Sequence, residues 1–276
     1  SSAVPPANVG ITQNQGYELV LNWSDTVGDL TYSIGGDVSW TRNKIIYKAE
    51  ANNPYPWMSA TGHAIGQRFG LVSDGLFDTQ EELANRPYNT YTSNIATLGD
   101  IRYKDQNGDN IIDSKDEVFL GRSDTPLYLG TNLTLKWKDF TFFAMANGYF
   151  GGKNIKSGSY FRPKAEDKYS ELVRYAWTPE TATTAIYPRL TATNAANNDR
   201  NSDFWMYDAD RITLGQVQVT YDLPKHIFNN SFVSGLSLYV AGYNLLTIAK
   251  ESDILELNIG SAPQTRYYSF GLKATF

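Results

Sequence analysis

The last ten residues, Tyr267-Tyr268-Ser269-Phe270-Gly271-Leu272-Lys273-Ala274-Thr275-Phe276, decide the fold. Counted back by twos from Phe276, every residue is apolar or aromatic, whereas the residues between them are small or polar. Because successive side chains of a strand point to opposite faces, one face of this strand is apolar and the other is polar. This alternation is typical of the closing strand of an outer-membrane β-barrel. The alternative is the last strand of a water-soluble sandwich, which alternates in the same way.

The composition restricts the class of protein. Of the 276 residues, 41% are apolar and 14% are aromatic, with 19 Tyr, 13 Phe and 6 Trp. Such a content suits a barrel, whose lipid-facing band is flanked by aromatic girdles. No apolar run reaches the roughly 18 residues that a membrane-spanning helix needs. The net charge of -5 argues against a nucleic-acid partner, and the absence of cysteine excludes disulfides and zinc-thiolate sites.

Six further segments alternate in the same way and bring the number of predicted strands to seven. They are residues 17–23, 32–40, 127–137, 140–148, 215–223 and 236–240. Short turns at 24–29 and 136–139 each join two strands, whereas the stretches 43–125 and 150–208 are long and irregular. Barrels of this kind have short periplasmic turns and long extracellular loops. We therefore expect both long stretches to be extracellular loops.

Seven strands do not close a bacterial barrel, which has an even number of strands and at least eight. An open sheet would leave two unpaired edges, which are unfavourable in lipid and in water. We therefore predict an all-β fold in which residues 1–276 are the C-terminal portion of a large transmembrane β-barrel. The segment from Ser1 to Ala7 lacks the pattern of a signal peptide, so the chain is expected to be a mature or internal piece of a longer protein.

Residues 105–116 have the spacing of a calcium-binding loop. The expected ligands are the side chains at loop positions 1, 3, 5, 9 and 12 and the carbonyl at position 7. These are Asp105, Asn107, Asp109, Asp113 and Asp116, with the carbonyl of Ile111. Ca²⁺ takes six to eight oxygen ligands, and this spacing wraps them around one centre. We expect a structural Ca²⁺ that rigidifies the long outer loop.

Two positions of this loop depart from the usual pattern. Position 6 is Asn110 in place of Gly, and Asn tolerates the left-handed conformation. Position 12 is Asp116 in place of Glu, which reaches less far, and the neighbouring Glu117 is available to assist. The alternative interpretation is a solvated acidic turn that holds no metal.

No catalytic residues are expected. The chain has no phosphate loop, dinucleotide-binding motif, zinc-protease motif or nucleophile elbow. Its two histidines, His63 and His226, lie far apart in the sequence. Trp57, Trp177 and Trp205 lie in the long loops, where they either pack the loops together or stack on a sugar. Polar strand residues are expected to line a wet interior, namely Asp37, Asn132, Gln216 and Gln218.

Several segments occur in an order that carries a resemblance. They are Asn8-Val9-Gly10 with Asn14-Gln15-Gly16-Tyr17-Glu18-Leu19; Asp74-Gly75-Leu76-Phe77 with Gln80-Glu81-Glu82; Gly99-Asp100-Ile101-Arg102-Tyr103-Lys104-Asp105-Gln106-Asn107-Gly108-Asp109; Asp210-Arg211-Ile212-Thr213-Leu214-Gly215 with Tyr221-Asp222-Leu223-Pro224; Tyr239-Val240-Ala241-Gly242-Tyr243-Asn244-Leu245-Leu246-Thr247; and the terminal strand. Together they resemble the SusC/RagA-type TonB-dependent transporters of the Bacteroidetes outer membrane.

The resemblance implies a Gram-negative outer-membrane importer, not an enzyme. The whole protein would be a barrel of about 22 strands with a plugged lumen. Its plug and its TonB-contacting segment would lie upstream of this chain. A SusD-like surface lipoprotein would cover the barrel, and the cargo would be a glycan or a peptide. The resemblance does not identify the substrate-binding residues.

A second interpretation comes from another class of protein. A secreted, β-rich carbohydrate-binding module with a structural calcium loop would share the aromatics, the alternation and the acidic loop. A glycoside hydrolase would need two carboxylates facing each other across a cleft, and no motif points to them. Extraction distinguishes the first two interpretations, because a barrel piece needs detergent and a module dissolves in buffer.

Overall fold

The computed structural model describes residues 9–163, 171–191, 196–228, 232–258 and 261–276. The chain is built mainly from strands, and the prediction of an all-β fold is confirmed. The α-helices within these residues are short, α1 (Gln80–Ala84) and α2 (Ser252–Leu257). No helix among the described residues has the length and apolarity to cross a membrane.

The chain divides into two compact units. The sheet unit comprises Gln15–Arg42, Asp124–Gly152 and Asp208–Phe276. The loop unit comprises Ser1–Asn14, Asn43–Ser123 and Lys153–Tyr207. The loop unit is therefore assembled mainly from the two stretches in which the sequence shows no alternation.

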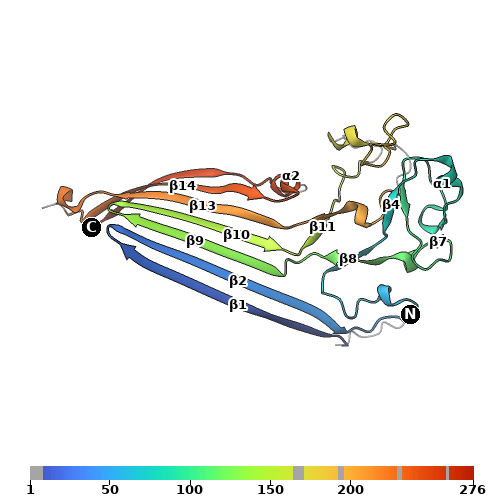
Figure 1. The fold of residues 1–276 in the computed structure, drawn as a ribbon, viewed down its shortest axis with the longest axis horizontal. Helices are drawn as coiled ribbons and strands as arrows, with labels where there is room; N and C mark the ends of the chain where they lie inside the picture. Colours follow the sequence, from blue (N-terminus) through green and yellow to red (C-terminus); the bar gives the residue numbers. More distant parts are fainter. Residues whose placement is uncertain (1–8, 164–170, 192–195, 229–231, 259–260) are drawn as a thin grey trace, which may run out of the picture. The chain divides into compact units, whose positions relative to one another are not determined.

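The sheet unit contains a seven-stranded antiparallel sheet with the strand order β1-β2-β9-β10-β13-β14-β15 (Figure 1). The strands are β1 (Ile11–Val27), β2 (Leu30–Tyr47), β9 (Leu127–Trp137), β10 (Phe140–Phe150), β13 (Arg211–Asp222), β14 (Gly235–Ile248) and β15 (Tyr267–Thr275). All seven correspond to predicted strands and follow the sequence order across the sheet. Each strand therefore pairs with the strands that precede and follow it, as in an up-and-down arrangement.

The strand ends differ from the sequence-based bounds. The predicted turn 24–29 is shorter in the structure, because β1 continues to Val27 and only Gly28 and Asp29 join it to β2. Gly28 has a φ of 61°, a conformation that glycine adopts without steric cost and that a two-residue hairpin turn needs. Backbone pairing, which is not visible in side-chain alternation, also lengthens β14 well beyond 236–240.

The registers place one set of side chains on each face of the sheet. Phe142 of β10 lies between Leu135 of β9 and Val219 of β13, and Val219 lies opposite Val240 of β14. The residues adjacent to these along each strand face the other way and are mostly polar. One bulge interrupts the pattern between Leu214 and Gln216, so the alternation shifts there by one residue.

The apolar face of the sheet is exposed. Many of its large side chains are exposed, from 36% at Leu30 to 79% at Phe270, whereas Leu135 and Phe142 near the middle of the sheet are half-buried. Others on this face are Leu19, Leu21, Trp23, Ile34, Leu129, Trp137, Phe140, Ile212, Leu238 and Leu272. A soluble sandwich would cover such a face with a second layer, because contiguous exposed apolar patches are uncommon on soluble proteins.

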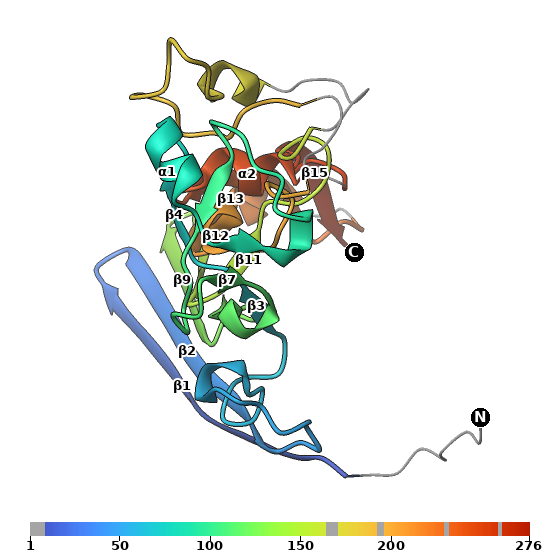
Figure 2. The same cartoon turned by 90° about the vertical axis from the view of Figure 1, so that its right-hand side faces the viewer.

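The loop unit is folded around a core of its own. Short strands pair within it: β3 (Gln67–Gly70) with β8 (Val118–Arg122), β4 (Ser73–Leu76) with β6 (Ile101–Tyr103), β5 (Tyr88–Asn89) with β7 (Ile111–Ile112), and β11 (Lys153–Ile155) with β12 (Met206–Asp208). Single 3-10 turns occur at Pro56–Met58, Thr90–Thr92, Ser114–Asp116, Glu171–Tyr175 and Asp203–Trp205, and another occurs at Lys225–Phe228 of the sheet unit. Figure 2 shows β3, β4 and α1 of the loop unit.

The core of the loop unit joins distant parts of the sequence. Its buried members are Leu71, Leu76, Ile101, Tyr103, Ile112, Ala176, Trp177, Tyr187 and Trp205. The two stretches expected to be irregular loops therefore carry short strands and pack on each other. Their strands are too short for the alternation of side chains to reveal them.

Candidate functional site

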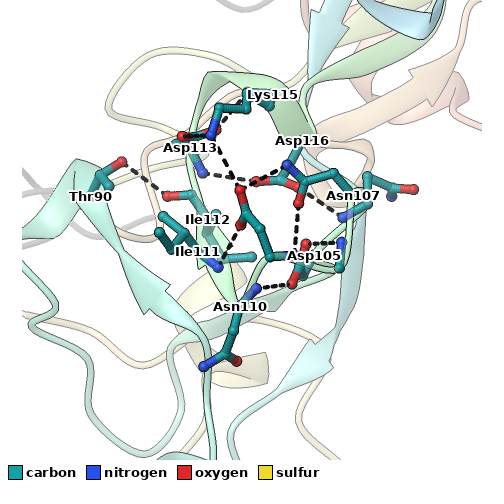
Figure 3. A network of polar contacts seen from close by, with 12 residues as sticks. Thr90, Asp105, Asn107, Asn110, Ile111, Ile112, Asp113, Lys115 and Asp116 are labelled. Atoms are coloured by element: carbon teal, nitrogen blue, oxygen red, sulfur yellow. Dashed lines mark hydrogen bonds and ion pairs between the residues drawn. The ribbon is translucent and has the colours of Figure 1, made fainter. Parts of the chain in front are cut away.

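The predicted calcium loop lies between β6 and β8 and includes β7. Ile112, at position 8, is 3% exposed and belongs to the core of the loop unit. Parallel pairing of β5 with β7 and the hydrogen bond from the Thr90 hydroxyl to the Ile112 carbonyl, 3.0 Å, hold this part of the loop (Figure 3). The loop is therefore anchored to the core through its apolar position.

Asp105 organises the first half of the loop. Its two carboxylate oxygens accept hydrogen bonds from the amides of Gly108, 2.7 Å, and Asn110, 2.6 Å (Figure 3). Asn110 has a φ of 62°, which confirms the expectation that Asn takes the left-handed conformation at position 6. Asn107 Oδ1 accepts from the amide of Asp109 at 3.0 Å, and Asp109 Oδ1 accepts from the amide of Ile111 at 2.9 Å.

Asp116 closes the loop from the inside. Asp116 is 0% exposed, and its carboxylate accepts hydrogen bonds from the amides of Gln106 and Asp113, both at 2.8 Å. Burial raises the pKa of Asp116, and the nearby charge of Asp105 adds to the rise. A buried carboxylate beside a second carboxylate is an environment that a cation would stabilise.

Lys115 supplies a positive charge within the same loop. Its Nζ lies 3.2 Å from a carboxylate oxygen of Asp109 and 3.2 Å from one of Asp113. The hydrogen bonds and charges of these two carboxylates raise the pKa of the Lys115 ammonium. The ammonium group therefore occupies a position between two of the six predicted ligands.

The fit of this loop to Ca²⁺ is good in chemistry and incomplete in geometry. All the predicted donors are oxygens, which a hard cation prefers, and they lie in one loop. Within the described residues, however, no three acidic or imidazole side chains are gathered as metal ligands. Glu117, the expected helper, instead accepts a hydrogen bond of 2.7 Å from the hydroxyl of Tyr91.

Sequence reasoning missed a pair of buried asparagines that connect the two long stretches. Asn198 Oδ1 accepts from the amide of Ile101 and its Nδ2 donates to Asp100 Oδ1, both at 2.9 Å. The Asn198 carbonyl accepts from Trp205 Nε1 at 2.7 Å. Arg189 Nε in turn lies 2.7 Å from Asp100 Oδ1. One residue thus joins the first stretch, through its side chain, to a buried aromatic of the second, through its backbone carbonyl.

Asn197 makes the second set of connections. Its Nδ2 donates to the carbonyl of Ile101 at 2.8 Å, and its Oδ1 accepts from Asn89 Nδ2 at 3.0 Å. Its carbonyl accepts from the hydroxyl of Tyr103 at 2.7 Å. Asn197 and Asn198 are each 5% exposed, yet they lie in an asparagine-rich run whose composition indicates a solvated loop. No signal in the sequence distinguishes these two from their neighbours.

The aromatic and histidine side chains of the long loops have structural roles. Trp177 and Trp205 are buried in the loop-unit core, as the packing interpretation predicts. Trp57 stacks on Tyr55 with ring centroids 4.6 Å apart and donates to the Lys115 carbonyl at 2.8 Å. His63 stacks on Phe119 at 4.6 Å.

The polar face of the sheet carries the four residues predicted to line a wet interior. Gln216 Nε2 donates to Gln218 Oε1 at 3.1 Å, and Gln218 Nε2 donates to Thr220 Oγ1 at 3.0 Å. Asp37 of β2 lies opposite Gly130 of β9. Two residues away on the same face, Asn132 of β9 lies opposite Gly35 of β2. A side chain in place of either glycine would collide with the polar group opposite it. The glycines therefore make room for this polar layer.

Sequence comparison finds relatives of one kind. No family model matches the chain. TonB-dependent receptor P3 of Formosa agariphila is 24% identical over 308 residues, which cover 98% of this chain and 29% of the receptor. TonB-dependent receptor P26 of the same organism is 25% identical over 300 residues, which cover 98% of this chain and 30% of the receptor. The chain thus spans less than a third of the length of these relatives.

Structure comparison finds solved transporters with a similar fold. The structure of the RagAB peptide transporter matches with a TM-score of 0.72 and 18% identity, covering 98% of this chain and 30% of that chain. The RagAB peptide importer in the 'closed-closed' state matches with a TM-score of 0.70 and 19% identity, over 98% of this chain and 30% of that chain. These relatives are receptors and transporters, not enzymes. The chain is therefore homologous to TonB-dependent receptors of the Gram-negative outer membrane, and its sheet has the fold of a segment of the RagA barrel.

Proposed function

We propose that the protein containing this chain is a TonB-dependent importer, and that the sheet forms part of its barrel wall. The single observation that carries this proposal is the exposed apolar face of the seven-stranded sheet. A carbohydrate-binding module in water has no use for such a face, whereas a barrel wall turns it toward lipid. The polar face, with Gln216, Gln218 and Asp37, would line the lumen.

In this proposal the loop unit lies outside the cell. The segments that link β2 to β9 and β10 to β13 build most of it, whereas the turns between β1 and β2 and between β9 and β10 are tight. Short turns on the periplasmic side and long loops outside are the usual asymmetry of outer-membrane barrels. A plug and a TonB-contacting segment would be supplied by parts of the protein outside residues 1–276.

The proposed cargo is an oligosaccharide or a peptide, delivered with a SusD-like surface lipoprotein that covers the barrel. The peptide alternative draws support from the structurally similar RagAB, which is a peptide transporter. The loop unit would offer the lipoprotein a rigid surface, because its two long stretches are held together by a buried core and by Asn197 and Asn198.

The proposal is tested by deleting the gene and measuring uptake of fluorescently labelled oligosaccharides and peptides. We expect uptake of one class to be lost and to return with the intact gene. A version without the TonB-contacting segment should insert in the outer membrane and fail to restore uptake. Extraction of the protein by buffer without detergent would contradict the proposal and favour the secreted module.

We also propose that the 105–116 loop binds a structural Ca²⁺ through Asp105, Asn107, Asp109, the Ile111 carbonyl, Asp113 and Asp116. The supporting observations are the oxygen donors, the left-handed Asn110 and the buried carboxylate of Asp116. Binding would require the Lys115 ammonium to leave Asp109 and Asp113, so the metal and the lysine would compete for the same oxygens.

Calcium titration of the purified protein by calorimetry tests this second proposal. We expect Lys115→Met to tighten Ca²⁺ binding about tenfold, because it removes the competing cation. Asp109→Asn should weaken binding, whereas Asp74→Asn, which changes an acidic residue outside the loop, should leave it unchanged. Absence of heat change in both the parent protein and Lys115→Met would show a solvated acidic turn instead.

A further inference from the structure

The apolar face of the sheet contains a hollow of about 430 Å³. Its walls are large side chains of five strands, including Leu19 and Leu21 of β1, Val38 of β2 and Leu129 of β9. Phe150 of β10 and Ile212 of β13 complete them. Such a volume falls within the range of roughly 300 to 1,000 Å³ that is usual for ligand pockets. A hollow of this size on an otherwise continuous apolar wall requires an explanation.

Small side chains in matching register form the floor of the hollow. Gly36 of β2 lies opposite Thr131 of β9, and Thr131 lies opposite Ala146 of β10. Gly148, two residues further along β10, lies opposite Leu129. On β2 and β9 the neighbouring positions of the same face are larger, Ile34 and Val38 beside Gly36 and Leu129 and Leu133 beside Thr131, so the depression follows from these small residues.

The one hydroxyl group in the floor of the hollow, that of Thr131, is already hydrogen-bonded. Thr131 Oγ1 donates to the carbonyl of Gly35 at 3.0 Å, so the hydroxyl is satisfied by the backbone. The adjoining Asp37 belongs to the opposite face by alternation and lies across from Gly130. The hollow therefore suits a hydrocarbon ligand better than a polar one.

A cation lies beyond the hollow on the same strand. Val38, Trp40 and Arg42 share one face of β2 by alternation, and Arg42 is exposed. Arg42 lies about 13 Å beyond Val38, at roughly 3.3 Å per residue. Among the described residues no carboxylate pairs with Arg42, so its guanidinium remains available to an anion. Phosphate is a group that arginine binds well.

An aromatic pair separates the hollow from this cation. The rings of Tyr17 and Trp40 are stacked with centroids 5.4 Å apart. Tyr and Trp are enriched where hydrocarbon meets the polar region of a membrane. The apolar hollow, the aromatic pair and Arg42 thus follow one another in the direction of β2. This order matches that of the acyl chain, the interfacial region and the headgroup of a lipid.

We propose that this face binds one phosphorylated glycolipid of the outer leaflet, with an acyl chain in the hollow and a phosphate at Arg42. The side of the membrane follows from the proposed function, because β2 leads at this end into the long segments of the loop unit. The hollow continues the lipid-facing surface, and the charge of Arg42 matches an anionic headgroup. A lipid held at this position would be retained when other membrane lipids are removed by detergent.

The test is native mass spectrometry of the full-length receptor, purified in detergent and incubated with lipid A. We expect one lipid A to remain bound through washing. Gly36→Leu should lower its retention about tenfold, because the new side chain fills the hollow and displaces buried CH₂ groups. A Cβ at position 36 would meet only the Gly130 carbonyl, at 4.0 Å, so the backbone accepts the substitution.

Two controls make the test specific. Ala144→Leu enlarges a side chain on the same face of β10 outside the hollow, and retention should stay at the parent level. Arg42→Gln should reduce retention of lipid A severalfold, whereas Lys138→Gln, at a turn, should not.

Three results would overturn the proposal. The first is equal retention of lipid A by the Gly36→Leu and Ala144→Leu variants. The second is equal retention of lipid A and zwitterionic phosphatidylethanolamine by the parent protein. The third is a parent protein that forms a dimer through this face, which Gly36→Leu dissociates without loss of lipid. Uptake of cargo is measured separately, so loss of transport with intact lipid binding would count against the proposed function alone.

Discussion

Phe270 in the sheet and Trp205 in the loop unit are both large aromatic residues, yet Phe270 is 79% exposed and Trp205 is 2% exposed. The loop unit follows the rule of soluble proteins and buries its apolar side chains in a common core. The sheet presents its apolar side chains to the surroundings along all seven strands. One chain thus contains a region folded for water and a region folded for lipid.

The difference predicts that truncation of an aromatic side chain destabilises the loop unit strongly and the sheet only slightly. Trp205→Ala should destabilise the loop unit by about 3 to 5 kcal/mol, because it opens a cavity in the core. It also removes the hydrogen bond from Nε1 to the Asn198 carbonyl. Limited proteolysis at increasing temperature measures this effect. Phe270→Ala is the matched control, and an equal loss of protection in both variants would contradict the distinction.

Introduction of a charge should separate the two faces of the sheet. Val240 is 49% exposed on the apolar face, whereas Gln218 lies on the polar face. Val240→Arg should cost about 2 to 4 kcal/mol in a bilayer if it lies near the midplane, because the charge must enter hydrocarbon. Urea unfolding in lipid vesicles measures the cost. Gln218→Arg should cost much less, and a reversed order would place the polar face toward lipid.

Loss of the buried amide should loosen the loop unit without affecting the sheet. Asn198→Ala removes hydrogen bonds to Ile101 and Asp100 and leaves buried polar groups without partners. We expect a destabilisation of about 1 to 3 kcal/mol. Hydrogen exchange should rise in the loop unit and stay low in the sheet strands. Asn201→Ala, close in sequence, serves as the comparison, and equal effects of the two would remove the special role of Asn198.

Acid should produce the smallest effect, in the segment around Glu50. The Glu50 carboxylate accepts hydrogen bonds from the Thr61 side chain and from the amides of Ala60 and Thr61, which lower its pKa to about 2. Because the folded pKa lies below the unfolded one, near 4.5, this stabilisation is present above pH 4.5 and is lost as the pH falls toward 2. The hydrogen-exchange rates of the Ala60 and Thr61 amides measure this loss. Glu50→Gln should abolish the pH dependence, and an unchanged dependence would assign it to another group.

The sheet could be predicted because its information is local. Alternation between Phe276 and Tyr268, or between Leu127 and Trp137, reflects a single physical requirement, that one face meets lipid. The turn at 24–29 is predicted, but its narrowing to Gly28 and Asp29 and the bulge near Gly215 are not, because backbone pairing decides them rather than side-chain polarity.

The loop unit could not be predicted, because its information is long-range. Asn198 becomes a buried connector only when Ile101 and Trp205 arrive beside it, almost a hundred residues away in one case. The calcium-loop spacing was visible, and Asn110 adopts the conformation expected of it. The ion pairs of Lys115 were not foreseen, since the motif specifies the oxygen positions and not the residues between them.

The central claim is that the apolar face of the sheet meets hydrocarbon. Spin labels attached to single cysteines at positions 268 to 275 of the full-length protein in lipid vesicles test it most directly, since residues 1–276 contain no cysteine. Collisions with oxygen, which concentrates in lipid, should be frequent at Tyr268, Phe270, Leu272 and Ala274 and rare at the positions between them. Immobile labels at those four positions, shielded from oxygen and from water-soluble quenchers alike, would show a second protein layer over this face and contradict the account.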